Sequence, residues 1–170
     1  MATRKPQGQN IGNSGEFYVA YLLSALDYVV TITLGRNEGY DLIAVAPSEE
    51  TYKISVKTMY ARNQKKFPLN KKDESPKGKD IYAFVKLNEF QEQPDYWILP
   101  AEVVSAVVAK SHQLYLEDVD RKGRQHKDNS IRNFLLTDHK YYPSGWSAIV
   151  QRYYKNQDLP NLPGRKEISV

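Results

Sequence analysis

Two short apolar segments that each contain a charged residue constrain the fold of this chain most. The segment GYDLIAV (39–45) contains Asp41, and YKISVKT (52–58) contains Lys57. Both have the composition of buried strands, and the short loop between them favours an antiparallel hairpin. Because alternate residues of a strand face the same side, Asp41 and Lys57 can approach each other across one face. Charges in core strands usually have a partner or a function.

The remaining elements predict an α/β fold. A helix is expected over residues 13–26, where Asn13 can act as the cap and Glu16 then falls at the third helical position, a capping-box pattern. Strands are expected over 28–34, 40–46, 52–58, 81–87 and 96–99, and helices over 101–110 and 144–154. Residues 59–80 are predicted to form mainly a basic loop, and 111–143 show no clear pattern.

The length of 170 residues suits a single domain. Residues 1–12 are interpreted as a flexible basic tail, 13–155 as the domain and 156–170 as a loose C-terminal tail. The chain has no cysteine, which excludes a disulfide scaffold, a thiolate zinc site and a cysteine nucleophile. No secretory signal is visible, and no apolar run approaches the roughly 18 residues of a membrane span. We therefore expect a cytoplasmic protein without a membrane partner.

Positive charge is concentrated in two segments. The formal net charge is +4, but residues 53–80 contain nine Lys or Arg and three acids, and RKGRQHK (121–127) forms a second cluster. Such sorting indicates a surface that faces a polyanion, although lysine-rich loops can also serve solubility alone. The candidate nucleic-acid-binding residues are Lys53, Arg62, Lys65, Lys66, Lys71, Lys72, Arg121 and Arg124. The histidines lack metal-ligand spacing and are interpreted as surface or packing residues.

The predicted hairpin and the helix before it can form a compact polar site. Asp41, Lys57 and Glu16 would place two carboxylates and an amine near one another. Two carboxylates can hold a hard cation such as Mg²⁺, and a neighbouring lysine can orient water or stabilise charge on a phosphate. The simpler alternative is a buried ion pair between Asp41 and Lys57, with Glu16 serving only as a helix cap.

The order of three short motifs resembles the PD-(D/E)XK nuclease superfamily. The motifs lie within about residues 12–60 and are Gly15-Glu16, Gly39-Tyr40-Asp41-Leu42 and Ser55-Val56-Lys57. They are most similar to those of small phage and bacterial members related to Holliday-junction resolvases and restriction endonucleases. The resemblance implies a restriction-endonuclease-like mixed central sheet flanked by helices, with DNA as the partner and Mg²⁺ or Mn²⁺ as the cofactor. It also implies a possible homodimer, because each site of such an enzyme cuts one strand.

Site roles follow from the resemblance position by position. Asp41 would be the principal metal ligand and Lys57 the catalytic lysine. Glu16 would complete the metal shell, and the carbonyl of Val56 could add an oxygen. The sequence departs from the pattern at Ser55, where the family has an acid or glutamine, although Glu38 could move in. It also lacks the family's helix after the third strand.

Three functions follow from these observations. The first is a Mg²⁺-dependent DNA endonuclease acting in repair, recombination or phage defence. The second is a catalytically degenerate fold that binds nucleic acid, and the third is a protein-interaction or immunity-type module on the same fold.

Overall fold

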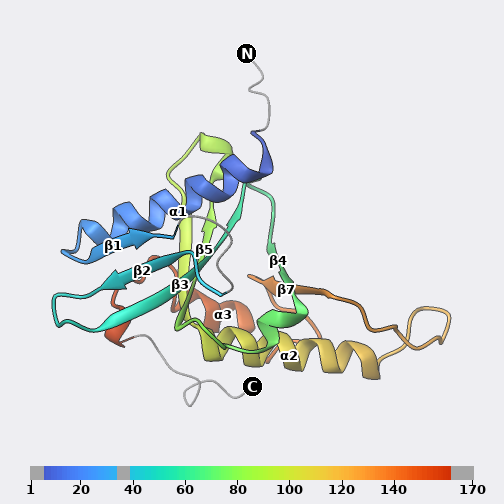
Figure 1. Cartoon of the computed structure of the whole chain (residues 1–170). Coiled ribbons are helices and arrows are strands. Elements are labelled where there is room, and N and C mark those ends of the chain that lie inside the picture. The colour runs from blue at the N-terminus through green and yellow to red at the C-terminus, as the bar shows by residue number, and fades with distance from the viewer. Residues whose placement is uncertain (1–5, 34–38, 162–170) are drawn as a thin grey trace.

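A five-stranded mixed sheet forms the centre of the molecule (Figure 1). The computed structural model describes residues 6–33 and 39–161. The strands are β1 (Val29–Ile32), β2 (Leu42–Val45), β3 (Thr51–Met59), β5 (Ile81–Lys86) and β6 (Asp95–Pro100), in the order β1-β2-β3-β5-β6. The pair β3–β5 is parallel and the other neighbours are antiparallel. The predicted α/β fold, with a mixed central sheet flanked by helices, is confirmed.

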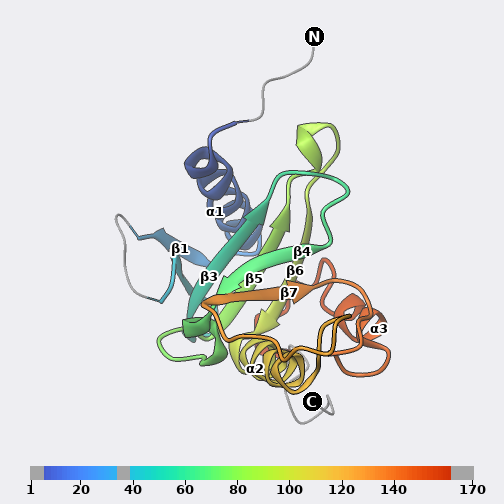
Figure 2. The same ribbon diagram turned by 90° about the vertical axis from the view of Figure 1, so that its right-hand side faces the viewer.

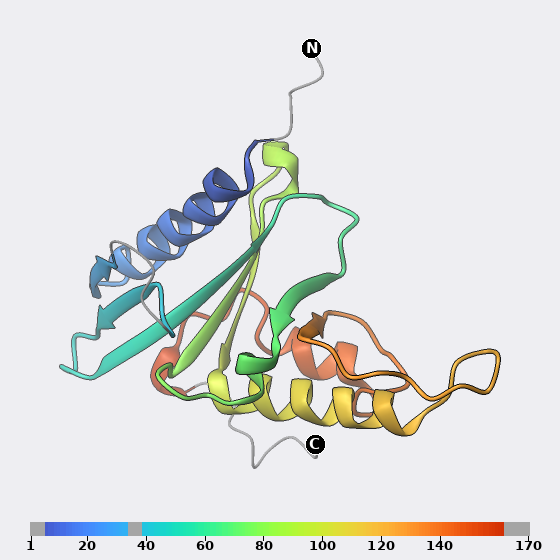
Figure 3. The same cartoon turned by 45° about the vertical axis from the view of Figure 1, so that its right-hand side comes forward.

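Each face of the sheet has its own cover (Figures 2 and 3). Helix α1 (Gly8–Ser24) packs on the face that contains Ile54 and Val56. The opposite face contains Tyr82 and Phe84 and is covered by α2 (Ala101–Glu117), α3 (Trp146–Gln151) and a two-stranded ribbon of β4 (Lys66–Asn70) and β7 (Ile131–Leu135). The sheet therefore lies between two separate hydrophobic clusters.

Helix α1 begins five residues before the predicted start. Residues 8–12 belong to the helix rather than to a tail, and Glu16 lies in its middle, so the predicted capping box is wrong. The reason is that the buried side of the helix extends back to Ile11, which repeats at four-residue spacing with Gly15, Val19 and Leu23. Gly15 brings α1 very close to β3, because a Cβ there would lie 1.9 Å from Oγ1 of Thr58.

The segment 59–80 is not mainly a loop. It contains β4 and a short 3₁₀ helix, η1 (Lys71–Glu74), and β4 pairs with β7 from the segment that showed no pattern. In β4, Phe67 and Leu69 are buried while Lys66, Pro68 and Asn70 are exposed, as strand alternation requires. Pro68 weakens the strand pattern in the sequence, but it is tolerated because β4 has only one described strand partner. The ribbon occupies the interval where the resemblance implied a helix.

The C-terminal part of the chain is more ordered than expected. Helix α2 extends to Glu117, beyond the predicted end at residue 110. The short helices η2 (Asn88–Phe90) and η3 (Leu159–Asn161) complete the elements, and Leu159 packs in the cluster beneath α1. Residues 156–161 are thus part of the domain. No helix in the described ranges is long and apolar enough to cross a membrane. Glu38 lies outside the described residues.

Candidate functional site

Asp41 lies at the point where the pairing of β2 with β3 stops while the pairing of β3 with β5 continues. Strand β2 pairs with β3 from Leu42, opposite Ile54, whereas β3 continues beside β5 to its end at Met59. At this point the Oδ2 atom of Asp41 accepts hydrogen bonds from the Val56 N–H at 2.6 Å and from the Ser55 hydroxyl at 3.3 Å. The Asp41 carboxylate therefore takes the position of a strand partner for β3 just before the first residue of β2.

Lys57 lies near this carboxylate without pairing to it. The described part of the chain has no ion pair between Asp41 and Lys57, so direct pairing does not explain the two charges. Lys57 is half-buried, and it lines a hollow of about 530 Å³ together with Asp41 and Ser55. We call this cavity the Asp41 hollow.

Glu16 on α1 responds to the charges of Asp41 and Lys57. It is half-buried, and its pKa is raised above the ordinary value of 4.5, first by desolvation and then by the negative charge of Asp41. The positive charge of Lys57 opposes this rise only in part. Two carboxylates with incomplete neutralisation repel each other, which is the electrostatic situation that a bound cation would relieve. The charges of Asp41 and Lys57 thus act on Glu16, and a joint role of the three residues in one site stays a prediction.

The Asp41 hollow carries excess positive charge. Its wall includes Lys72, Lys77 and Lys79 from the segment 71–80, which we call the strap, in addition to Lys57. Two carboxylates, those of Asp41 and Asp73, face these four lysines. A concave site with more cations than anions attracts phosphate groups.

Asp73 is the site residue that sequence reasoning missed. It is 1% exposed and accepts hydrogen bonds from the Tyr82 hydroxyl at 2.5 Å, the Lys79 ammonium at 3.1 Å and the Asn70 N–H at 2.8 Å. Burial tends to raise the pKa of Asp73, but these hydrogen bonds and the charge of Lys57 lower it below its ordinary value. Asp73 is therefore held ionised and fastens the strap to the sheet. The signal was the Asn70–Asp73 spacing, which matches the capping box observed at η1.

The residues around Asp41 form only part of a binding site for a metal with oxygen ligands. No group of three His, Cys, Asp or Glu residues within the described ranges could hold an ion. Asp41 and Glu16 still supply two carboxylates, and Mg²⁺ is often held by one or two carboxylates with water and substrate phosphates. Ser55 donates its hydroxyl proton to Asp41 and so supports that carboxylate.

The candidate DNA-binding residues are distributed over several surfaces. Lys72 lines the Asp41 hollow, and Lys53 lies over the ring of Tyr40 at its edge. Among the others, Arg62 pairs with Glu92, Lys71 with Asp128 and Arg124 with Asp120, whereas Lys65, Lys66 and Arg121 are exposed. Arg121 and Arg124 belong to a loop that extends beyond the C-terminal end of α2 (Figure 3). The structure therefore places Lys72 in the lining of the hollow and Lys53 against its lining residue Tyr40, whereas the second basic cluster does not line it.

Comparisons with known proteins find distant likeness among solved structures alone. No protein-family model and no curated protein matches the chain. Among solved structures, a bacterial homing endonuclease aligns with a TM-score of 0.47 and 13% identity. The alignment covers 88% of this chain and 95% of that chain. Similarity at this level does not assign the chain to a family.

Proposed function

We propose that this chain is a metal-dependent endonuclease that cleaves phosphodiester bonds of DNA. The observation that carries the proposal is the lysine-rich hollow lined by Asp41 and Lys57, together with the effect of the Asp41 charge on Glu16. Two mutually repelling carboxylates suit a cation, and the surrounding lysines suit the phosphates of a nucleic acid. We extend the proposal to a cytoplasmic role in repair, recombination or phage defence, and to a homodimer when both DNA strands are cut.

Each side chain has a separate role in this proposal. Asp41 and Glu16, with the carbonyl of Val56, would hold Mg²⁺ or Mn²⁺. The metal would polarise a phosphate oxygen and lower the pKa of bound water. Lys57 would stabilise negative charge that develops on the phosphate, and Lys72 would hold a neighbouring backbone phosphate. Ser55 is a positioning residue, because its hydroxyl donates to Asp41.

A second candidate is binding of nucleic acid without cleavage. It is favoured by the bonding of Asp41, whose Oδ2 atom is already used by the backbone of Val56 and the hydroxyl of Ser55. A serine also replaces the acid that would otherwise bring a third carboxylate to the site. In this version the lysines of the Asp41 hollow bind phosphates while no metal is held.

Plasmid nicking and DNA binding by purified protein separate the two candidates. We expect nicking of supercoiled or branched DNA in Mg²⁺ or Mn²⁺ and none in chelator. Lys57→Met and Asp41→Asn should each reduce the rate by about 100-fold or more, while Lys110→Met, an exposed lysine of α2, should not. Asparagine keeps one oxygen for the Val56 N–H, so folding is preserved.

The other outcomes are equally decisive. Tight DNA binding without nicking in either metal would establish the second candidate. If the wild type neither binds nor cuts DNA, both proposals are wrong.

A further inference from the structure

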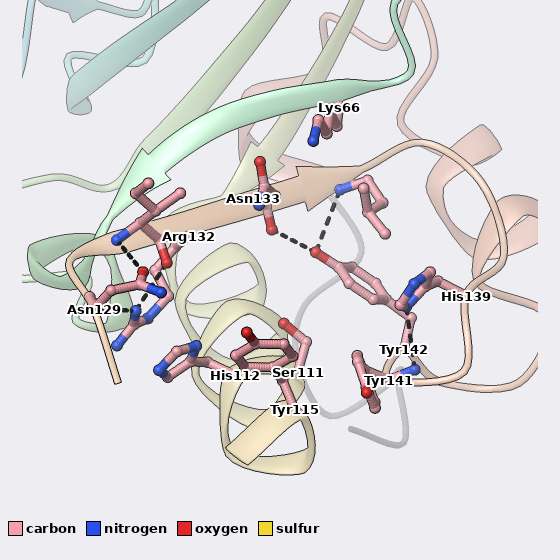
Figure 4. A pocket seen from close by; sticks show the side chains of 12 residues that line it. Lys66, Ser111, His112, Tyr115, Asn129, Arg132, Asn133, His139, Tyr141 and Tyr142 are labelled. Carbon is pink, nitrogen blue, oxygen red and sulfur yellow. Dashed lines mark hydrogen bonds between the residues drawn. The ribbon is translucent and has the colours of Figure 1, made fainter. Parts of the chain in front are cut away.

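A second pocket lies apart from the Asp41 hollow, between α2, β7 and residues 136–142 (Figure 4). Its volume is about 560 Å³. Tyr115 reaches it from α2, and Tyr141 and Tyr142 close it from the segment after β7. We call it the tyrosine pocket.

The rings of the tyrosine pocket are held in place by contacts with the fold. The Tyr142 hydroxyl donates to the Asn133 carbonyl at 2.6 Å and accepts from the Leu135 N–H at 3.3 Å. Burial raises the pKa of Tyr142 to about 12, so this hydroxyl stays neutral. The Tyr141 hydroxyl donates to Asp118 at 2.6 Å. The rings thus present fixed flat surfaces, which lose little conformational entropy when a ligand stacks on them.

Tyr115 shows that this region already stacks planar groups. The ring of His126 lies parallel to that of Tyr115, with centroids 4.0 Å apart, and His112 stacks at 5.7 Å. His112 also bonds to Asp128 at 2.8 Å, which fixes its orientation. A planar heterocycle can therefore stack here, either beside His126 or in its place.

The charge on the lining favours an anion. The residues that line the tyrosine pocket include Lys66 and Arg132 but no Asp or Glu. Arg132 is buried and bonds to Glu74 and to the Asn129 carbonyl, so its guanidinium group is held in place by the protein and forms part of the pocket lining. Lys66 is exposed at the β4 side (Figure 4) and has no ion pair among the described residues. The amide of Asn133 likewise makes no hydrogen bond through its side chain within the described ranges.

We propose that the tyrosine pocket binds one nucleotide, with the base stacked on Tyr115 or Tyr141 and the phosphate facing Lys66. The Asn133 amide can donate to and accept from the edge of a base. Stacking surfaces, a free amide and a lysine without an ion pair among the described residues together match a planar heterocycle joined to a phosphate. The ligand is either an unpaired base of a nucleic-acid strand or a free mononucleotide.

The strand version rests on the proposed function, and the structure supplies a connection between the two sites. Lys72 and Asp73 of η1 line the Asp41 hollow, and Glu74 of the same short helix bonds to Arg132 of the tyrosine pocket. A strand that continues from the Asp41 hollow along η1 would bring its neighbouring nucleotides to the tyrosine pocket. An unpaired nucleotide placed there would make the chain select single-stranded or branched substrates.

Binding in chelator tests the pocket without cleavage. The probes are a fluorescein-labelled single-stranded 15-mer, a duplex of the same sequence, and AMP and TMP as competitors. Tyr115→Leu should weaken binding of the single strand by at least about fivefold, because loss of one stacked base costs at least that much. Tyr21→Leu, which removes an exposed ring on α1, is the matched control and should change affinity less than about twofold.

Photocrosslinking of the unaltered protein provides an independent readout. A strand with 5-iodouracil should attach to peptides that contain Tyr115, Tyr141 or Tyr142. Competition by AMP or TMP would identify a free nucleotide as the ligand, and its absence would identify a strand. Crosslinks confined to other peptides, or equal losses for Tyr115→Leu and Tyr21→Leu, would overturn the proposal. Because both readouts are taken in chelator and need no cleavage, failure of cleavage and failure of the pocket are distinguishable.

Discussion

Removing the carboxylate of Asp73 should destabilise the protein strongly. In Asp73→Ala the ammonium of Lys79 and the hydroxyl of Tyr82 lose their shared acceptor, and both groups are buried. Leaving one buried member of an ion pair without its partner costs about 3–5 kcal/mol. For a chain of this size each kcal/mol lowers Tm by about 2–4 °C, so the loss corresponds to about 6–20 °C.

Urea denaturation measures this free energy directly. The m-value should stay constant, since only native contacts change. Because the folded-state pKa of Asp73 is lowered, its contribution is present above the ordinary pKa of 3.8 and is lost as the pH falls through the folded-state pKa. The control Glu92→Ala removes an exposed ion pair with Arg62 and should cost less than about 1 kcal/mol. A similar small cost for Asp73→Ala would refute the view that this network fastens the strap.

Three further substitutions test the packing and the charge of the site. Gly15→Ala should lower the free energy of unfolding by about 1–3 kcal/mol, because the added Cβ meets Thr58. The control Gly12→Ala lies on the same helix with open space around it and should be neutral or stabilising. Thermal unfolding compares the two variants. Because the pKa of Glu16 is raised in the folded state, its ionisation destabilises the fold as the pH rises from 4.5 through the folded-state pKa. Glu16→Gln should remove this part of the pH dependence of stability, and it should also abolish nicking. Identical urea midpoints for the wild type and Glu16→Gln across that pH range would contradict the stability prediction. Ser55→Ala loses one long hydrogen bond of 3.3 Å, so it should cost about 1 kcal/mol or less and leave nicking largely intact in a plasmid assay.

The central elements could be predicted because their patterns are local. The hairpin of β2 and β3 and the continuous apolar run of β5 are visible in sequence as strand segments. Strand β4 could not be recognised in this way, because Pro68 and the surrounding lysines resemble a loop. Its strand character depends on β7, which lies more than sixty residues away. The start of α1 was misplaced because a cap pattern at Asn13 competed with the burial of Ile11, and tertiary packing determined the result.

Part of the candidate site was also visible in the sequence. The order of the motifs predicts a site of Glu16, Asp41 and Lys57, and in the structure Asp41 and Lys57 both act electrostatically on Glu16. The roles of the three residues stay a prediction. The bonding of Asp41 to the backbone of β3 could not be foreseen, since it depends on where β2 begins. Asp73 was hidden in a segment of lysines, and only the folded chain brings it against Tyr82.

The pairing of β4 with β7 has a consequence for the order of folding. Asn70 pairs with Ile131 and Lys66 with Leu135, whereas the β2–β3 hairpin joins near neighbours in the chain. Pairing of distant segments closes a long loop and slows folding, so we expect the ribbon to form after the hairpin. During synthesis the ribbon cannot form until residue 135 has left the ribosome. Because η1 directly follows β4, the wall of the Asp41 hollow is then completed late, and a nascent chain carries Asp41 and Lys57 before it carries a finished site.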